Sequence, residues 1–333
     1  MYRTNITAKE VEEAVLAVLA GTPTATAASR AGMDAADLAE AASLYQQAGR
    51  MALEAQIGSA RWHQILIEFT DHKTAEDVAK EHLLPTLRQA ETDGLISSWW
   101  YIRKFPCWRL RLHAGKASPA YTQKIFSRAL DGLTSRQLIV GWRPGIYEAE
   151  TCAFGGPTAM RTAHRIFHAD SRAFLEYIAR EKATEPPARM LGRREISVLL
   201  CSALLRAAGQ DWHEQGDVWH RITRMRHLPS SISPDQLHSM QEDLRRLMTL
   251  DTHPASPLVA PGGPLAFARP WLTAFTETGD ALATEAHTGT LKRGLRDILS
   301  QHIIFHWNRI GLADQTQSTL AHVAYETIMG APA

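Results

Sequence analysis

Several features that would assign a protein to a common class are absent from this sequence. No uninterrupted apolar run approaches the roughly 20 residues that span a bilayer, and the N-terminal stretch is too polar for a secretory signal. Lys and Arg (36) nearly balance Asp and Glu (35), so bulk charge favours neither nucleic acid nor an anionic membrane. The 3 cysteines form no CxxC pair, which argues against a zinc knuckle or a thioredoxin-like site. We therefore expect a reduced, cytoplasmic protein that binds neither nucleic acid nor membrane.

The familiar catalytic motifs are also absent. The sequence has no GxGxxG, no Walker A loop, no GxSxG and no HExxH. His302 and His306 have the i, i+4 spacing of metal ligands, but three apolar residues separate them and neither a carboxylate nor a third ligand is nearby. The sequence therefore predicts no metal site and no cofactor.

The first part of the chain is predicted to be helical. Thr7 is a plausible N-cap, apolar residues follow at helical spacing, and Gly21 and Pro23 end the first helix. Two further helices around Gly32 resemble a helix-turn-helix, although the second has few side chains that read base edges. A small helical cap over residues 1–58 is the favoured interpretation, and a DNA-binding regulator is an alternative.

At Trp62 the apolar period changes from helical to alternating. The pattern predicts a strand, a helix with a Thr74–Asp77 capping box and a kink at Pro85, a hairpin around Pro106, and a second helix. Residues 137–148 are expected to form a strand pair with Gly141 and Pro144 in its turn. This order is that of a ferredoxin-like split βαβ.

From Thr158 onward the pattern is mainly helical, interrupted by a Pro- and Gly-rich loop at 252–270. The predicted fold class is therefore α+β: a ferredoxin-like antiparallel sheet core, a small N-terminal helical cap, and a largely helical C-terminal half. Residues 59–330 are expected to form the main domain.

Two segments of this domain carry the polar chemistry. In an alternating strand, Arg109, Arg111 and His113 share one face, which could hold the carboxylate or carbonyls of a peptide. Glu148 and Glu150 follow a strand, close to the start of a helix, and suit a pocket wall. A solvated outer sheet face and ordinary turn chemistry are the respective alternatives.

The same segments resemble a known family. WWYIRKxPxWRLRL, YExExxxFGG, AHRIFHADSRAFL and HWNRIGL are similar to the C-terminal elimination domain of lantibiotic dehydratases, from about Trp62 to Met329. The thiopeptide pyridine synthases are similar to that domain, and the N-terminal LYQQAG stretch resembles the stand-alone thiopeptide members.

Two positions distinguish the branches of this family. The resemblance implies that eliminating members carry an arginine three residues after the second glutamate, where this chain has Ala153. It also implies a catalytic histidine four residues before the Asn of the NR pair, where this chain has Ile304. These differences favour the pyridine synthase branch over a glutamyl eliminase.

The implied reaction is a formal aza-[4+2] cycloaddition between two dehydroalanines of an azole-containing precursor peptide. Loss of water and of the leader peptide then gives the pyridine. The expected partners are that modified precursor and other enzymes of its pathway. A stand-alone glutamyl eliminase and a non-catalytic precursor-binding protein are the alternatives.

The candidate site residues follow from the resemblance and from helix geometry. On the helix at 291–312, Ser300 and Gln301 share one side with Ile304, and His306 lies about 120° from Ser300 at 100° per residue. The pocket is expected between Tyr147–Gly156, the helix with Asp170 and this helix. The catalytic candidates are Glu150, Asp170, Ser300, Gln301, His306 and Tyr147, and the substrate-binding candidates are Arg109, Arg111, Trp99, Trp100, Tyr101 and Asn308.

Overall fold

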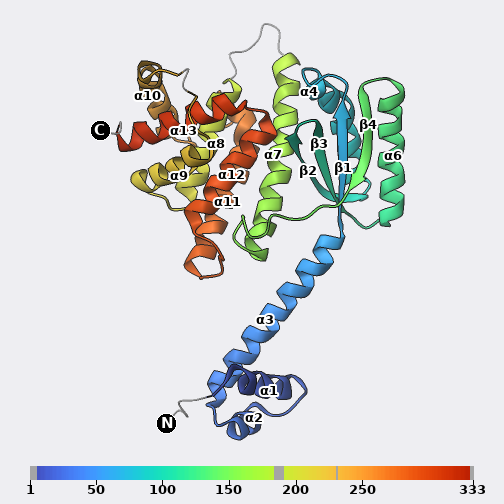
Figure 1. The fold of residues 1–333 in the computed structure, drawn as a ribbon, viewed down its shortest axis with the longest axis vertical. Helices are drawn as coiled ribbons and strands as arrows, with labels where there is room; N and C mark the ends of the chain where they lie inside the picture. The colour runs from blue at the N-terminus through green and yellow to red at the C-terminus, as the bar shows by residue number, and fades with distance from the viewer. Residues whose placement is uncertain (1–5, 184–190, 230–231, 331–333) are drawn as a thin grey trace. The chain divides into compact units, whose positions relative to one another are not determined.

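The computed structural model describes residues 6–183, 191–229 and 232–330, which divide into two units at Ala60 and Arg61 (Figure 1). Unit 1 contains α1 (Ala8–Leu19), α2 (Thr24–Ala31) and α3 (Ala35–Ala60). Thr7 and Glu10 form a capping box on α1, and Gly32 ends α2 in the left-handed conformation at φ 69°. A small separate core holds the three helices together and consists of Ala14, Val15, Ala27, Ala28, Leu38 and Ala42.

Unit 2 begins with a four-stranded antiparallel sheet. Its strands are β1 (Trp62–Phe69), β2 (Ile96–Lys104), β3 (Cys107–Ala114) and β4 (Ile139–Gly145), in the order β2-β3-β1-β4. A helical segment joins β1 to β2, and α6 (Pro119–Ser135) joins β3 to β4 (Figure 1). The ferredoxin-like split βαβ prediction is confirmed.

Three local predictions in this region need correction or refinement. The Thr74 side chain accepts no capping bond, and its hydroxyl donates to Asp71 O instead, so the capping box is wrong. The helix is interrupted near Pro85, but by a π turn: α4 (Ala75–Val78) leads into Ala79–Leu83 and then α5 (Leu84–Thr92). Residues 139–145 form one strand, not a pair, and Pro144 is tolerated because β4 is an edge strand.

The rest of unit 2 is helical, as predicted. Its helices are α7 (Pro157–Ala183), α8 (Arg193–Ala207), α9 (Trp212–Met225), α10 (Pro234–Thr249), α11 (Arg269–His287), α12 (Leu295–Ile310) and α13 (Asp314–Met329). The predicted loop is irregular up to Leu265. Every residue of α8 from Ile196 to Leu205 is buried, so this helix is the centre of the helical half. Gly279 lets α11 approach it, because a Cβ there would lie 2.5 Å from Leu204 O.

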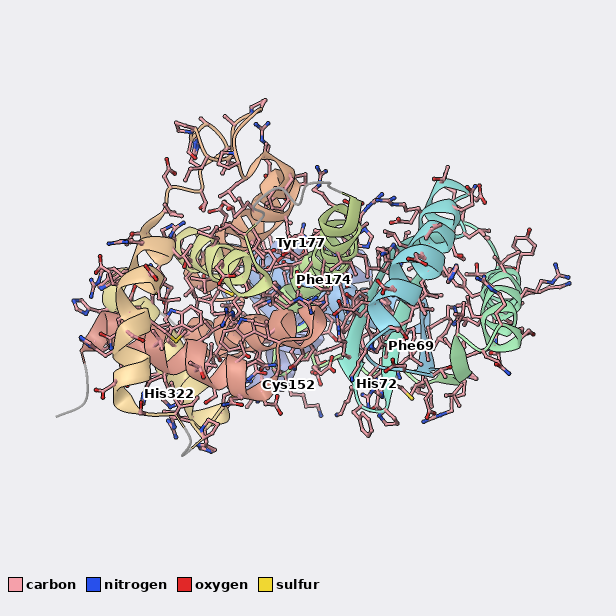
Figure 2. All side chains as sticks on the ribbon, turned by 90° about the horizontal axis from the view of Figure 1, so that it is seen from above. Phe69, His72, Cys152, Phe174, Tyr177 and His322 are labelled. Carbon is pink, nitrogen blue, oxygen red and sulfur yellow. The ribbon has the colours of Figure 1, made fainter. Side chains whose placement is uncertain are left out.

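Helix α7 lies between the sheet and the helices that follow it in the chain (Figure 1). Phe174 and Tyr177, labelled in Figure 2, lie 6.5 and 6.2 Å from Trp271 of α11, measured between ring centroids. Toward the sheet, α7 reaches the edge strand β2, where Ser171 Oγ accepts a hydrogen bond from Tyr101 N. No helix among the described residues is long and apolar enough to cross a membrane.

Candidate functional site

Arg111 is a buried cation at the centre of the sheet. Directly opposed residues of antiparallel strands share a face, so the register places Arg111 beside Gln64 of β1 and Trp100 of β2. Its Nε donates to Gln64 Oε1 at 2.9 Å, and its guanidinium carbon lies 4.0 Å from the Trp100 ring centroid. Burial lowers the pKa of Arg111 to about 10, so it remains charged at neutral pH.

The segment that leaves β4 covers this cation. Gln64 Nε2 donates to Ile146 O at 2.9 Å and so anchors the start of the segment. The Tyr147 ring then lies 4.7 Å from the Arg111 guanidinium carbon, on which Trp100 also packs. Further along, Glu150 Oε1 lies 3.9 Å from Arg111 Nη2. The structure therefore brings together four of the predicted residues, Arg111, Trp100, Tyr147 and Glu150.

Arg111 and Glu150 each retain an unused polar atom. Arg111 Nη1 and Glu150 Oε2 are enclosed and make no hydrogen bond. Buried polar groups usually have partners, so such atoms mark positions where a ligand could bind. One is a donor and the other an acceptor, which is the complement of a peptide amide.

Tyr147 is held by a residue that the sequence did not single out. Its hydroxyl lies 2.7 Å from Nε2 of His164, on α7. The His164 ring lies 4.6 Å from the ring of Trp62 on β1. Burial lowers the pKa of His164 to about 3 and raises the pKa of Tyr147, so both groups are neutral near pH 7. We call Gln64, Trp100, Arg111, Tyr147, Glu150 and His164 the Arg111 site.

Asp170 and His306 lie elsewhere, in a fully buried network. Asp170 Oδ1 accepts from Trp271 Nε1 at 2.8 Å and from His306 Nδ1 at 2.9 Å, and Arg309 pairs with Oδ2. Burial alone would raise the pKa of Asp170, but His306 and Arg309 hold it below its usual range. The exposed fraction of the Asp170, His306 and Arg309 side chains is at most 1%.

The network joins several elements. His306 Nε2 lies 3.0 Å from Ser197 Oγ on α8, and Arg309 Nε donates to Tyr101 O on β2. With Asp170 on α7 and Trp271 on α11, it links the sheet to four helices. This arrangement favours a structural role for Asp170 and His306.

The other candidates on α12 also make internal contacts. Ser300 Oγ donates to Asp297 O at 2.7 Å within the helix. Gln301 Nε2 lies 3.5 Å from Met225 Sδ. Asn308 Oδ1 accepts from Gln317 Nε2 at 3.0 Å. The structure does not bring these three side chains to the Arg111 site.

The remaining binding candidates lie on β2 and β3. Trp99 is buried, and its backbone hydrogen-bonds to His168. Tyr101 is buried and stacks on Trp108 at 4.7 Å between ring centroids. Arg109 is half-buried on the Arg111 face and makes no hydrogen bond or ion pair with another described residue. Arg109 is therefore the one of these three on the same face of the sheet as the Arg111 site.

The strand-end segment and α12 meet, but Phe154 fills their contact. Phe154 is fully buried, and its ring centroid lies 4.9 Å from those of both His302 and Phe305. Ala153 is half-buried and Ile304 is buried. Neither alanine nor isoleucine has a titratable side chain. The Arg111 site therefore draws on the strand-end segment, α7 and the sheet, and α12 does not contribute to it.

His302 is predicted to make folding sensitive to acid. Both its ring nitrogens are enclosed without partners, and burial lowers its pKa to about 3. Below about pH 6.5 His302 binds a proton in the unfolded chain but stays neutral in the folded protein. The free energy of unfolding therefore falls as pH falls. Between pH 7 and pH 5 the loss is about 2 kcal/mol.

His302→Leu should remove this contribution. Urea unfolding at pH 7 and pH 5 would measure it, with exposed His238→Gln as the control. An unchanged pH dependence in His302→Leu would contradict this explanation.

Among the described residues, no group of three His, Cys, Asp or Glu is arranged to hold a metal ion.

Comparison with known proteins identifies relatives of unit 2. The family model described as the C-terminal part of the lantibiotic biosynthesis dehydratase matches residues 62–328. No match was found among curated proteins.

Two solved structures are similar in fold. The tRNA-dependent lantibiotic dehydratase MibB from Microbispora sp. 107891 has a TM-score of 0.57 at 18% identity, over 80% of this chain and 28% of MibB. TsrL has a TM-score of 0.54 at 15% identity, over 80% of this chain and 94% of TsrL. This chain therefore matches little more than a quarter of MibB. Because the family model spans most of the sequence, the chain belongs to the lantibiotic biosynthesis dehydratase C-terminal family.

Proposed function

We propose that this protein is a pyridine synthase that joins two dehydroalanines of a ribosomally made, azole-containing peptide. Membership of a family of lantibiotic biosynthesis proteins supports a modified peptide as the substrate. The observation that carries the proposal is the unused donor on Arg111 beside the unused acceptor on Glu150, between aromatic side chains.

The reaction begins with an amide that must tautomerise to an imidic acid. This step takes a proton from the amide nitrogen and adds one to the oxygen, so it needs an acceptor and a donor. In the proposed complex the Glu150 carboxylate accepts the N–H proton, and Arg111 binds the amide oxygen. The Tyr147 hydroxyl supplies the proton to that oxygen. Paired acid–base assistance of this kind contributes about 10²–10⁴-fold.

The cycloaddition itself requires the two alkenes to be held face to face. Well-oriented intramolecular reactions gain up to about 7–11 kcal/mol from positioning. Trp100 and Tyr147 both pack on Arg111 and contact each other edge to face at 5.8 Å, and Trp62 lies 5.6 Å from Tyr147 between ring centroids. We propose that Trp62 and Tyr147 stack on the azoles and alkenes of the substrate, whereas Trp99, Trp100 and Tyr101 are buried and pack in the core.

The alternative on the same fold is glutamate elimination from a glutamylated serine. That chemistry is attributed to an arginine and a histidine at the positions of Ala153 and Ile304, and neither residue here can transfer a proton. The cycloaddition as written consumes no redox cofactor. We further propose that unit 2 carries the activity, in the cytoplasm, and that unit 1 is an accessory helical domain and not a DNA reader.

Two precursors distinguish the candidate functions. The purified protein is incubated separately with a glutamylated precursor and with the fully dehydrated, azole-bearing one, and masses are compared. A pyridine synthase leaves the first unchanged and converts the second, whereas an eliminase converts the first. A non-catalytic binding partner would bind the precursor and convert neither.

A further inference from the structure

Tyr147 and His164 form a hydrogen-bonded pair at the edge of the Arg111 site. Their polar atoms lie 2.7 Å apart, although the residues come from different elements, the segment after β4 and helix α7. Aromatic rings surround the His164 imidazole, with centroids at 4.6 Å for Trp62, 6.3 Å for Trp100 and 6.4 Å for Phe167. This packing fixes the plane and position of the imidazole ring.

The two nitrogens of His164 differ in their surroundings. Nε2 points to the Tyr147 hydroxyl. Nδ1 hydrogen-bonds to no described residue, and His164 is only partly buried, so we assign Nδ1 as the nitrogen that faces solvent. Besides burial, two groups of β3, His113 and Arg111, lower the pKa of His164 by their charge and so favour the neutral ring. His164 therefore connects the buried phenol to solvent through a neutral imidazole.

We propose that His164 is the positioning residue of Tyr147: its Nε2–H donates to the phenol oxygen, directs the phenol proton to the substrate amide oxygen, and restores that proton from solvent. This inference rests on the proposed function. In the opposite tautomer Nε2 would accept the phenol proton and turn it away from the substrate.

The proton transfers balance within the site. The amide N–H proton goes to Glu150, and the phenol proton goes to the amide oxygen. As the phenol O–H bond breaks, the Nε2–H proton of His164 moves to the phenol oxygen, and Nδ1 takes a proton from water. The phenol is regenerated, and the hydroxide left in solvent is neutralised when Glu150 releases its proton. The imidazole is left as its other neutral tautomer and returns to the Nε2–H form by proton exchange with solvent before the next turnover.

A double-mutant cycle tests this assignment with the full-length protein and the dehydrated, azole-bearing precursor. His164→Phe keeps a flat ring between the aromatic walls and removes both nitrogens. We expect kcat to fall about 10²-fold while KM changes less than about threefold. Tyr147→Phe should show a loss at least as large. Because His164 acts through Tyr147, the double variant should be no slower than Tyr147→Phe alone.

Two further measurements separate positioning from packing. Millimolar imidazole should restore part of the activity of His164→Ala and none of that of Tyr147→Phe. His168→Gln, one turn further along α7, should retain kcat within about twofold and serves as the matched control.

The outcomes that overturn the proposal are distinct from those that overturn the proposed function. A wild-type protein that does not convert the precursor refutes the proposed function and this inference with it. An active wild type with an equally active His164→Phe refutes only the role of His164. Additive losses in the cycle, or no imidazole rescue, likewise refute only that role.

Discussion

Asp170→Asn is expected to lower the free energy of unfolding by about 3–5 kcal/mol, because removing one partner of a buried ion pair leaves the other charge uncompensated. The Asp170 carboxylate accepts from Trp271 and His306 and pairs with Arg309, and no solvent reaches it. The amide cannot balance the Arg309 charge, and its NH₂ group would face another donor. Since domains are stable by only about 5–15 kcal/mol, this loss would leave much of the protein unfolded on mild heating.

Urea unfolding followed by circular dichroism measures this effect at pH 7. Glu176→Gln is the control on the same helix, because its ion pairs with Arg88 and Arg172 are solvent-exposed and are worth about 1 kcal/mol or less. The lowered pKa of Asp170 means that its contribution is present above the unfolded carboxyl pKa and is lost as pH falls through the folded value. A variant of wild-type stability but no activity would instead restore Asp170 as a catalytic residue.

Glu150→Gln is expected to reduce turnover by about 10²–10⁴-fold while the fold is retained. The carboxylate is the proposed proton acceptor, and the amide that replaces it is not a base. Its side chain is 36% exposed and its ion pair with Arg111 is long, at 3.9 Å, so the substitution should cost little stability. Glu148→Gln, exposed in the same segment, is the matched control and should remain active.

Substrate binding can be followed separately from turnover at Cys152. Cys152, labelled in Figure 2, is exposed two residues after Glu150, whereas Cys107 and Cys201 are buried. A precursor bound over the Arg111 site should slow alkylation of Cys152 in both the wild type and Glu150→Gln. Full activity in Glu150→Gln, or loss of this shielding together with activity, would contradict the assigned role of Glu150.

Much of the sheet could be predicted from the sequence, because its signals are local. The alternation of Arg109 and Arg111 with Trp108 and Leu110 placed the cations on one face, and the order of strands and helices along the chain followed from the changes in period. The π turn before Pro85 was not predictable in this way, since proline indicates an interruption but not its form.

The composition of the site depended on non-local packing. Gln64 joins Arg111 only through the register of β1 with β3, and His164 joins Tyr147 only because α7 packs beside the sheet. The sequence signal for His164 was weak, a histidine one turn before His168 on the face of a long helix.

The helical period of α12 does not identify one catalytic face, and the reason is physical. The helix is enclosed nearly all round, so Ser300 and His306, which face different sides, are both buried and bonded internally. Periodicity identifies a functional face only on a helix that has a solvent-facing side.

The most direct test of the central claim is the mass of the product formed from a fully dehydrated, azole-bearing precursor. With the wild-type protein we predict loss of water and release of the leader peptide as a carboxamide. The remaining core should have the mass and the ultraviolet absorbance of a pyridine-containing macrocycle. Recovery of the intact precursor after incubation with correctly folded protein, under conditions where Cys152 is shielded, would contradict the claim.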